Sequence, residues 1–182
     1  MTITQDLEMK QTIADSVAQK MLLAARTAPK ARGKDTLIAA AADKEGRKAI
    51  AAHMRRMVGE NRAATFFLRD ADNLEAADGL VLLGTSIDPM RLDHCGLCGF
   101  ANCDEKEKHP NHPCAFNTGD LGIAMGSAVS VAMDSRIDNR VMFSIGMAVR
   151  DMKLLGEEAK IVYGIPLAIG GANPFFDRKP KK

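Results

Sequence analysis

The sequence predicts a layered domain in which helices pack on a sheet, of the α/β or α+β class. Helical segments alternate with a few strand-like segments, and residues 120–137 form one segment that is apolar nearly all round. All four cysteines lie in an aperiodic segment between the two halves of this pattern. Because 182 residues is the length of one domain with an insertion, we expect a single domain over 1–182 with a Cys-rich insert at 88–118.

The first half of the chain is expected to hold two helices joined by a loop and a strand. Apolar residues recur at helical spacing at Ile13, Val17 and Met21, and Pro29 ends that pattern. The elements expected, in order, are a helix over 4–28 with Thr4 as its N-cap, a basic loop over 27–34, a buried strand over 35–43, and a helix after Asp43 that presents Ile50, Met54, Met57 and Val58 on one face and stops at Gly59 and Asn61.

The second half is expected to alternate in the same way around the insert. The apolar run 80–87 is typical of a central strand buried on both faces. The other elements expected are a short helix over 69–79 capped by Gly79, a buried helix over 120–137 whose Gly122 and Gly126 would let another backbone approach closely, a helix over 142–156 stopped by Gly156, a strand over 159–171 that Pro166 makes partly an edge, and a solvated polar tail from Phe175.

Composition narrows the classes of function. A net charge of +2 argues against nucleic acid or an anionic membrane as the main partner. The N-terminus has no signal-peptide pattern, and no apolar run reaches the length of a membrane span. We therefore expect a cytoplasmic protein with reduced thiols, in which clustered cysteines indicate metal binding or redox chemistry before disulfides.

The cysteines follow the pattern C-x2-C-x4-C-x10-C, with Cys95, Cys98, Cys103 and Cys114. Three close thiolates and a later fourth suit a [4Fe–4S] cluster, and Gly96 and Gly99 would let backbone N–H groups face its sulfurs. Four neighbouring side chains are expected to keep this loop partly dry: Leu97, Phe100, Ala101 and Phe116.

Two alternatives to a cluster stay open for these cysteines. Structural zinc is the first, since only one Cys-x2-Cys pair is present but three nearby histidines offer nitrogen ligands. Reactive or disulfide-forming cysteines are the second. We expect the histidines to be solvated loop residues: His94, His109 and His112.

The segment CGLCGFANC with its later cysteine resembles the four-cysteine motif of ferredoxin-domain proteins. Together with AARTAPKARG, FFLRDADN and DLGIAMGSAVSVA, it makes most of the chain similar to a family of uncharacterised bacterial and archaeal proteins that contain a ferredoxin domain. This resemblance implies an iron–sulfur cluster on the four cysteines. The family's own function is open.

Outside the insert the chain resembles the nitroreductase family of flavoproteins, through residues 24–33, 120–133 and 147–170. That likeness implies an α+β fold of the three-layer α/β/α type and a homodimer, with FMN at its interface reduced by a nicotinamide cofactor. The family's N-terminal Arg-Arg-Ser phosphate grip is absent here. Lys30 and Arg32 would hold the flavin phosphate instead, or form a plain solvated turn.

Other polar residues are expected to be structural. Asp70, Asp72, Glu75 and Asp78 are expected on a solvated helix face, with Arg69 and Asp70 as an ion pair at the core edge, and His53 is expected to be inert. Three hypotheses follow: a flavin-linked iron–sulfur oxidoreductase, an iron–sulfur electron carrier for a redox partner that the sequence does not identify, and a non-enzymatic adaptor with structural zinc.

Overall fold

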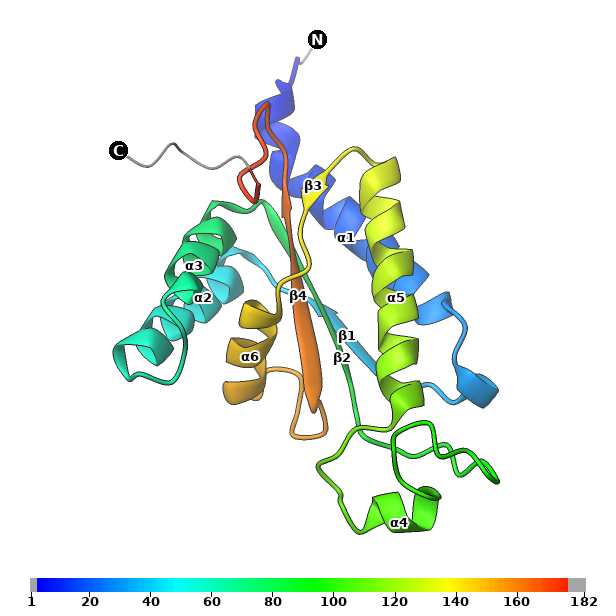
Figure 1. The fold of residues 1–182 in the computed structure, drawn as a ribbon. Helices are drawn as coiled ribbons and strands as arrows, with labels where there is room; N and C mark the ends of the chain where they lie inside the picture. The colour runs from blue at the N-terminus through cyan, green and yellow to red at the C-terminus, as the bar shows by residue number, and fades with distance from the viewer. Residues whose placement is uncertain (1–2, 177–182) are drawn as a thin grey trace.

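A four-stranded antiparallel sheet, in the order β1-β2-β4-β3, forms the middle layer of the computed structural model, which describes residues 3–176 (Figure 1). The strands are β1 Leu37–Ala41, β2 Gly79–Thr85, β3 Asp138–Asn139 and β4 Ile161–Ala168. Helices cover both faces, so the three-layer α+β architecture expected from the sequence is confirmed.

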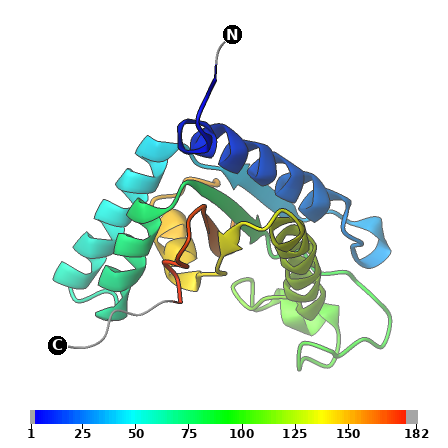
Figure 2. The ribbon, with the colours of Figure 1, turned by 90° about the horizontal axis from the view of Figure 1, so that it is seen from above.

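The two helical layers differ in membership. One face of the sheet carries α1 (Lys10–Thr27) and α5 (Ala115–Asp134), and the other carries α2 (Lys44–Gly59), α3 (Phe66–Ala76) and α6 (Phe143–Asp151), as Figure 2 shows. The remaining helical pieces are the 3-10 turns Asp6–Met9 and Ala31–Gly33 and the short α4 (Cys103–Glu107).

Strand β2 explains how one sheet serves two cores. Every residue of β2 is buried. Because side chains alternate along a strand, Leu80 and Leu82 pack on the α2/α3/α6 side, while Val81 and Leu83 pack on the α1/α5 side. The uninterrupted apolar run that predicted a central strand is the consequence of this two-sided burial.

Strand β4 pairs with β2 from Ile161 to Leu167 and meets β3 only at its end. Gly164 exchanges two backbone hydrogen bonds with Met142, on the edge of β4 that is turned away from β2. The backbone of Pro166, two residues further on, is turned to the same edge. It lies between the Met142 bridge and the β3 pairing, where no strand pairs with this edge of β4. The partial edge expected there is confirmed.

Several helix ends differ from expectation. The first α-helix begins at Lys10 after a 3-10 turn, so Thr4 is not its N-cap, and Ile13 is 41% exposed. Helix α3 begins at Phe66, earlier than expected, because Phe67 is needed in the core. Gly79 is the first residue of β2 and caps nothing, since the chain enters the sheet directly there.

Helix α5 is buried on one side only, so the expectation of a fully buried helix is wrong for the single chain. Leu121, Ala124 and Ala128 face the sheet, whereas Gly122 and Ile123 lie at the surface. α5 also begins earlier than expected, at Ala115, because the insert ends there.

The C-terminal elements are shorter than expected. α6 ends at Asp151, and the chain turns before entering β4. Phe175, expected in a solvated tail, is buried in the core, while the end of that tail, 177–182, lies outside the described residues.

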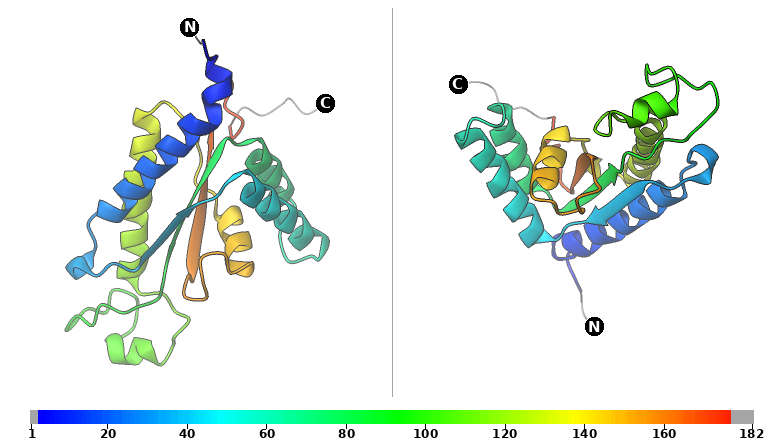
Figure 3. Two further views of the ribbon diagram at one scale, coloured as in Figure 1. Left: turned by 180° about the vertical axis from the view of Figure 1, so that it is seen from behind. Right: turned by 90° about the horizontal axis from the view of Figure 1, so that it is seen from below.

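The insert that follows β2 and the turn between α6 and β4 lie at the same end of the sheet (Figures 1 and 3). In the part of the chain that the structure describes, no helix combines the length and the apolarity needed to cross a bilayer.

Candidate metal centre

All four cysteines line one cavity within the insert. Cys95 and Cys98 lie in the turns after β2, Cys103 is the first residue of α4, and Cys114 immediately precedes α5. The thiols are unpaired; Cys114 is buried and the other three are partly exposed. Secondary structure therefore positions two of the four sulfurs, and tight turns position the other two.

Glycine makes those turns feasible. Gly96 and Gly99 have φ values of +60° and +89°, a region in which a side chain is strained. The Gly99 N–H donates to the Gly96 carbonyl at 3.0 Å, which closes the turn around Cys98. The Gly99 N–H is thus used within the turn, whereas a role of these glycines toward cluster sulfurs stays a prediction.

The insert is held to the domain by a side chain that the sequence pattern did not single out. Asn117, in the first turns of α5, is fully buried. Its Oδ1 accepts from the Asp88 N–H at 2.9 Å, and its Nδ2 donates to the Asp88 carbonyl at 3.1 Å. This pair of bonds joins the two ends of the insert, so the loop between them starts and finishes at one point.

Lys106 is the one charged side chain that lines the cysteine cavity. It is 2% exposed, although lysine is almost never buried unless paired. Within residues 3–176 its ammonium has no hydrogen-bond or ion-pair partner. Its neighbour Lys108, in contrast, is exposed and pairs with Glu105 at 2.6 Å. Its ammonium is not among the fully buried atoms that lack a partner in the described residues, so it keeps some contact with solvent. A cation beside four thiols favours a negatively charged occupant of the cavity.

Apart from the polar Asn102, the rest of the cavity lining is apolar. Leu97 and Phe116 contribute, as expected, together with Pro89 and Met90, whereas Phe100 and Ala101 lie elsewhere. Phe100 instead stacks on His109, with centroids 5.0 Å apart, and meets His112 edge-on at 4.9 Å. These two histidines are thus used in ring contacts outside the cavity, and His94 is exposed.

The donor set fits an iron–sulfur cluster. Four thiols, no histidine and a mostly dry wall are the surroundings such clusters take. The same four thiols are also a complete ligand set for tetrahedral zinc. The donor set therefore fits both of the metals expected from the sequence.

The two residues of the basic loop that were expected to bind the flavin phosphate make different hydrogen bonds. Lys30 Nζ donates to the carbonyls of Ala25, Arg26 and Ala28 at 2.7–2.8 Å, so it caps the C-terminus of α1. Arg32, with φ +55°, donates to the Met90 carbonyl at 3.1 Å. Only Arg32 still presents free donors to solvent.

Two further cations join Arg32 beside the start of the insert. Arg32, Lys34 and Arg91 line a cavity of about 340 Å³, with Pro89 and Met90 as its apolar wall. Lys34 also pairs with Asp88 at 2.6 Å. Lys34 and Arg91 were not predicted for this site, because they come from different segments that meet only in the fold.

The loop is tied to α5 by a buried carboxylate. Both oxygens of Asp120 accept from the Ala31 N–H, at 3.0 and 3.2 Å. This bond links the basic loop to the helix that follows Cys114, so both candidate cofactor regions rest on α5.

The acidic group expected on a solvated face is only half solvated. Asp72 and Glu75 are exposed and pair with Arg55. Asp70, however, is buried: it accepts from Ser144 Oγ at 2.6 Å and from Arg69 at 2.7 Å, which joins α3 to α6. The Arg69–Asp70 ion pair expected at the core edge is confirmed.

His53 is structural. Its Nε2 lies 2.6 Å from Asp151 Oδ2, and its Nδ1 contacts Arg56. Hydrogen bonds from His53 and then from Arg62 hold the pKa of Asp151 below its ordinary value. These contacts join α2 to α6.

A relative and a family description match this chain. A protein from Archaeoglobus fulgidus, described as "Uncharacterized protein", is 39% identical over 172 residues, which cover 89% of this chain and 90% of the relative. The family "Uncharacterized protein containing a ferredoxin domain" matches residues 110–178, which include Cys114 but not the other three cysteines.

Solved structures share the fold. A nitroreductase family protein from Clostridium novyi NT superposes with a TM-score of 0.59 at 12% identity, over 93% of this chain and 77% of that one. A BluB-like flavoprotein from Clostridium difficile 630 gives 0.59 at 15%, over 92% and 84%. NfrA1 of B. megaterium gives 0.55 at 12%, over 92% of this chain, which spans only 62% of NfrA1.

Proposed function

The chain belongs to the family of uncharacterized proteins that contain a ferredoxin domain, and from this premise we propose that it is a cytoplasmic redox protein carrying a [4Fe–4S] cluster. The ligands would be Cys95, Cys98, Cys103 and Cys114. The observation that carries the proposal is the convergence of all four thiols on one mostly apolar cavity. A cluster bound there would transfer single electrons.

Each part of the insert has a task in this proposal. Gly96 and Gly99 allow the backbone to wrap the cluster, and Asn117 keeps the two ends of the loop together. The ammonium of Lys106 would offset the net negative charge of a thiolate-bound cluster and so raise its reduction potential.

We further propose that FMN binds beside the insert, because the fold is that of nitroreductase-type flavoproteins. Arg32, with Lys34 and Arg91, would hold its phosphate. Lys30 would support that loop through its bonds to α1. A bound flavin would couple the single-electron steps to two-electron chemistry.

A homodimer completes the proposal. The outward face of α5 exposes Ile123 (48%) and Met133 (59%), and a side chain built at Gly122 or Gly126 would meet nothing within 4 Å. Such an apolar, small-residue face is suited to close packing against a second copy. Replacing Ile123 with Glu is expected to yield monomers in light scattering; Leu68→Glu, at 41% exposure on α3, is the matched control.

The deciding experiment is an absorption spectrum with iron, sulfide and zinc analysis on anaerobically purified protein. We expect a broad violet–blue band that dithionite bleaches, with four iron and four sulfide per chain. Cys98→Ala should lose the band, while Leu97→Ala, in the same cavity but without a ligand atom, should keep it. A colourless protein with one zinc per chain would overturn the proposal in favour of a structural zinc adaptor.

A further inference from the structure

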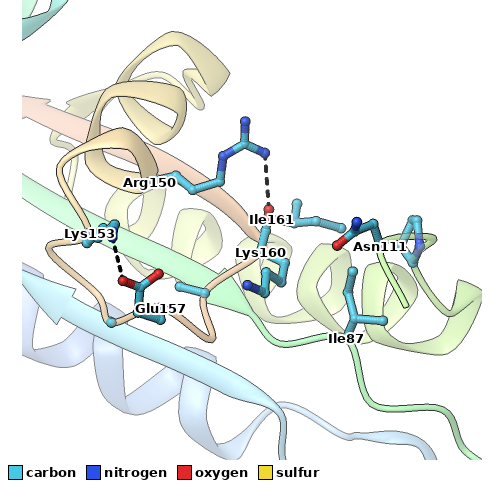
Figure 4. A pocket seen from close by; sticks show the side chains of 10 residues that line it. Ile87, Asn111, Arg150, Lys153, Glu157, Lys160 and Ile161 are labelled. Atoms are coloured by element: carbon cyan, nitrogen blue, oxygen red, sulfur yellow. Dashed lines mark hydrogen bonds and ion pairs between the residues drawn. The ribbon is translucent and has the colours of Figure 1, made fainter. Parts of the chain in front are cut away.

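A cavity of about 440 Å³ lies between the cysteine insert and the turn that joins α6 to β4 (Figure 4). Its volume is in the range of small-molecule sites. Asn111 and Pro113 of the insert line one side, and Pro113 directly precedes Cys114. This cavity and the cysteine cavity therefore share one stretch of chain.

Three cations and one carboxylate line the opposite side. Lys153 Nζ pairs with Glu157 Oε1 at 2.5 Å. The hydrogen bond from Lys153, with help from nearby Lys160, holds the pKa of Glu157 below its ordinary value, so this pair is charged and internally neutral. The net charge of the lining is therefore decided by the two remaining cations.

Arg150 and Lys160 are those cations. Arg150 donates one long bond, 3.4 Å, to the Lys160 carbonyl and keeps its other donors. In the described part of the chain neither side chain forms an ion pair, although Lys160 lies near enough to Glu157 to lower its pKa. Two unneutralised cations on one cavity wall favour a carboxylate or phosphate group.

The cavity also offers apolar surface. Ile87, Ala159 and Ile161 line its floor. An adjoining hollow of about 150 Å³ shares Arg150, Lys160 and Ile161 and adds Phe143 and Tyr163. A ligand held by its anionic group at Arg150 would therefore have aromatic and aliphatic side chains for the rest of its surface.

We propose that this cavity binds an organic anion, a phosphate or carboxylate on a planar apolar body, as the small-molecule redox substrate. The inference rests on the proposed redox function, since it places the substrate one residue along the chain from a cluster ligand. The site differs from the cavity beside Arg32, because no residue lines both of them.

Calorimetric titration with phenyl phosphate, on the protein purified with its metal, tests this inference. Arg150→Gln and Lys160→Gln should each weaken binding by about tenfold. Glu157→Gln should tighten binding, because the substitution removes the carboxylate that lines the cavity and releases Lys153. Lys44→Gln, an exposed cation at the start of α2, is the control and should change nothing. The opposite sign expected for Glu157→Gln separates binding from loss of fold.

The outcomes are separable. Phenyl phosphate that fails to bind, or binds all variants equally, overturns the site while leaving iron and sulfide content to test the cluster. Inorganic phosphate that binds as tightly as phenyl phosphate overturns the apolar part. If the anaerobically purified chain contains no iron or sulfide but still binds phenyl phosphate, the redox function is overturned and the anion site stands.

Discussion

Helix α6 carries Arg150 and can lie where it does only because residue 146 is glycine. A Cβ added at Gly146 would lie 1.7 Å from the Val162 carbonyl oxygen and 2.4 Å from the carbonyl carbon. Ordinary contact between heavy atoms is about 3.5 Å. In Gly146→Ala the helix must therefore withdraw from β4 by more than about 1 Å. The atoms that the new Cβ would meet belong to the backbone of β4, which cannot rotate away as a side chain could.

The expected loss follows from what this withdrawal opens. Ile145, Ala148 and Val149 of α6 are fully buried between α2 and the sheet. Overpacking alone typically costs 1–3 kcal/mol, and loosening three buried side chains adds to it, so we expect about 3 kcal/mol or more. For a chain of this size that is a fall in Tm of roughly 10 °C.

Urea unfolding followed by circular dichroism measures this loss, on samples of equal metal content. Gly59→Ala is the control: it lies at the end of α2, a Cβ there meets nothing within 4 Å, and it should stabilise by at most about 1 kcal/mol. A Gly146→Ala protein within about 0.5 kcal/mol of the parent would refute the packing deduced here.

Three further predictions concern charge. Lys106→Met should lower the cluster's reduction potential, by about 59 mV for a tenfold change in the equilibrium constant, because a cation of the cysteine cavity is lost. Lys108→Met removes the same charge from the surface and should leave the potential unchanged. Equal potentials in the Lys106→Met and Lys108→Met proteins would refute the assignment. Asp151→Asn should lower the free energy of unfolding at neutral pH, because a carboxyl whose pKa is depressed contributes stability above its ordinary pKa of 3.8. The difference from the parent should fade as the pH drops below about 4, and a difference that does not change with pH would contradict this account. The exposed Asp134→Asn is the control. Arg32→Ala should weaken FMN retention in equilibrium dialysis, whereas Lys30→Ala should chiefly lower stability, by about 1 kcal/mol; a reversed pattern would return the phosphate to Lys30.

The sequence by itself determined the features that depend on near neighbours. The four cysteines fall within one short segment, so their spacing was enough to predict that they meet. The run 80–87 predicted a central strand because burial on both faces demands apolar residues at every position. Asp43 preceded a helix, and its side chain does cap it, accepting from the Gly46 N–H at 2.7 Å.

Only the tertiary structure decided where each polar side chain lies. Lys106 and Lys108 are alike in sequence context, yet one is buried in the cysteine cavity and the other is exposed. Lys30 looked like a phosphate ligand, but α1 ends where its carbonyls reach the ammonium. Asp70 looked solvated until α6 brought Ser144 against it.

The same holds for surfaces and cavities. Periodicity showed that α5 is apolar but not that one apolar face lies outside the core of the single chain. Arg150 and Asn111 meet at one cavity although about 40 residues separate them. The pattern of a chain records what each segment prefers to contact, whereas the partner it contacts depends on how distant segments are brought together by packing.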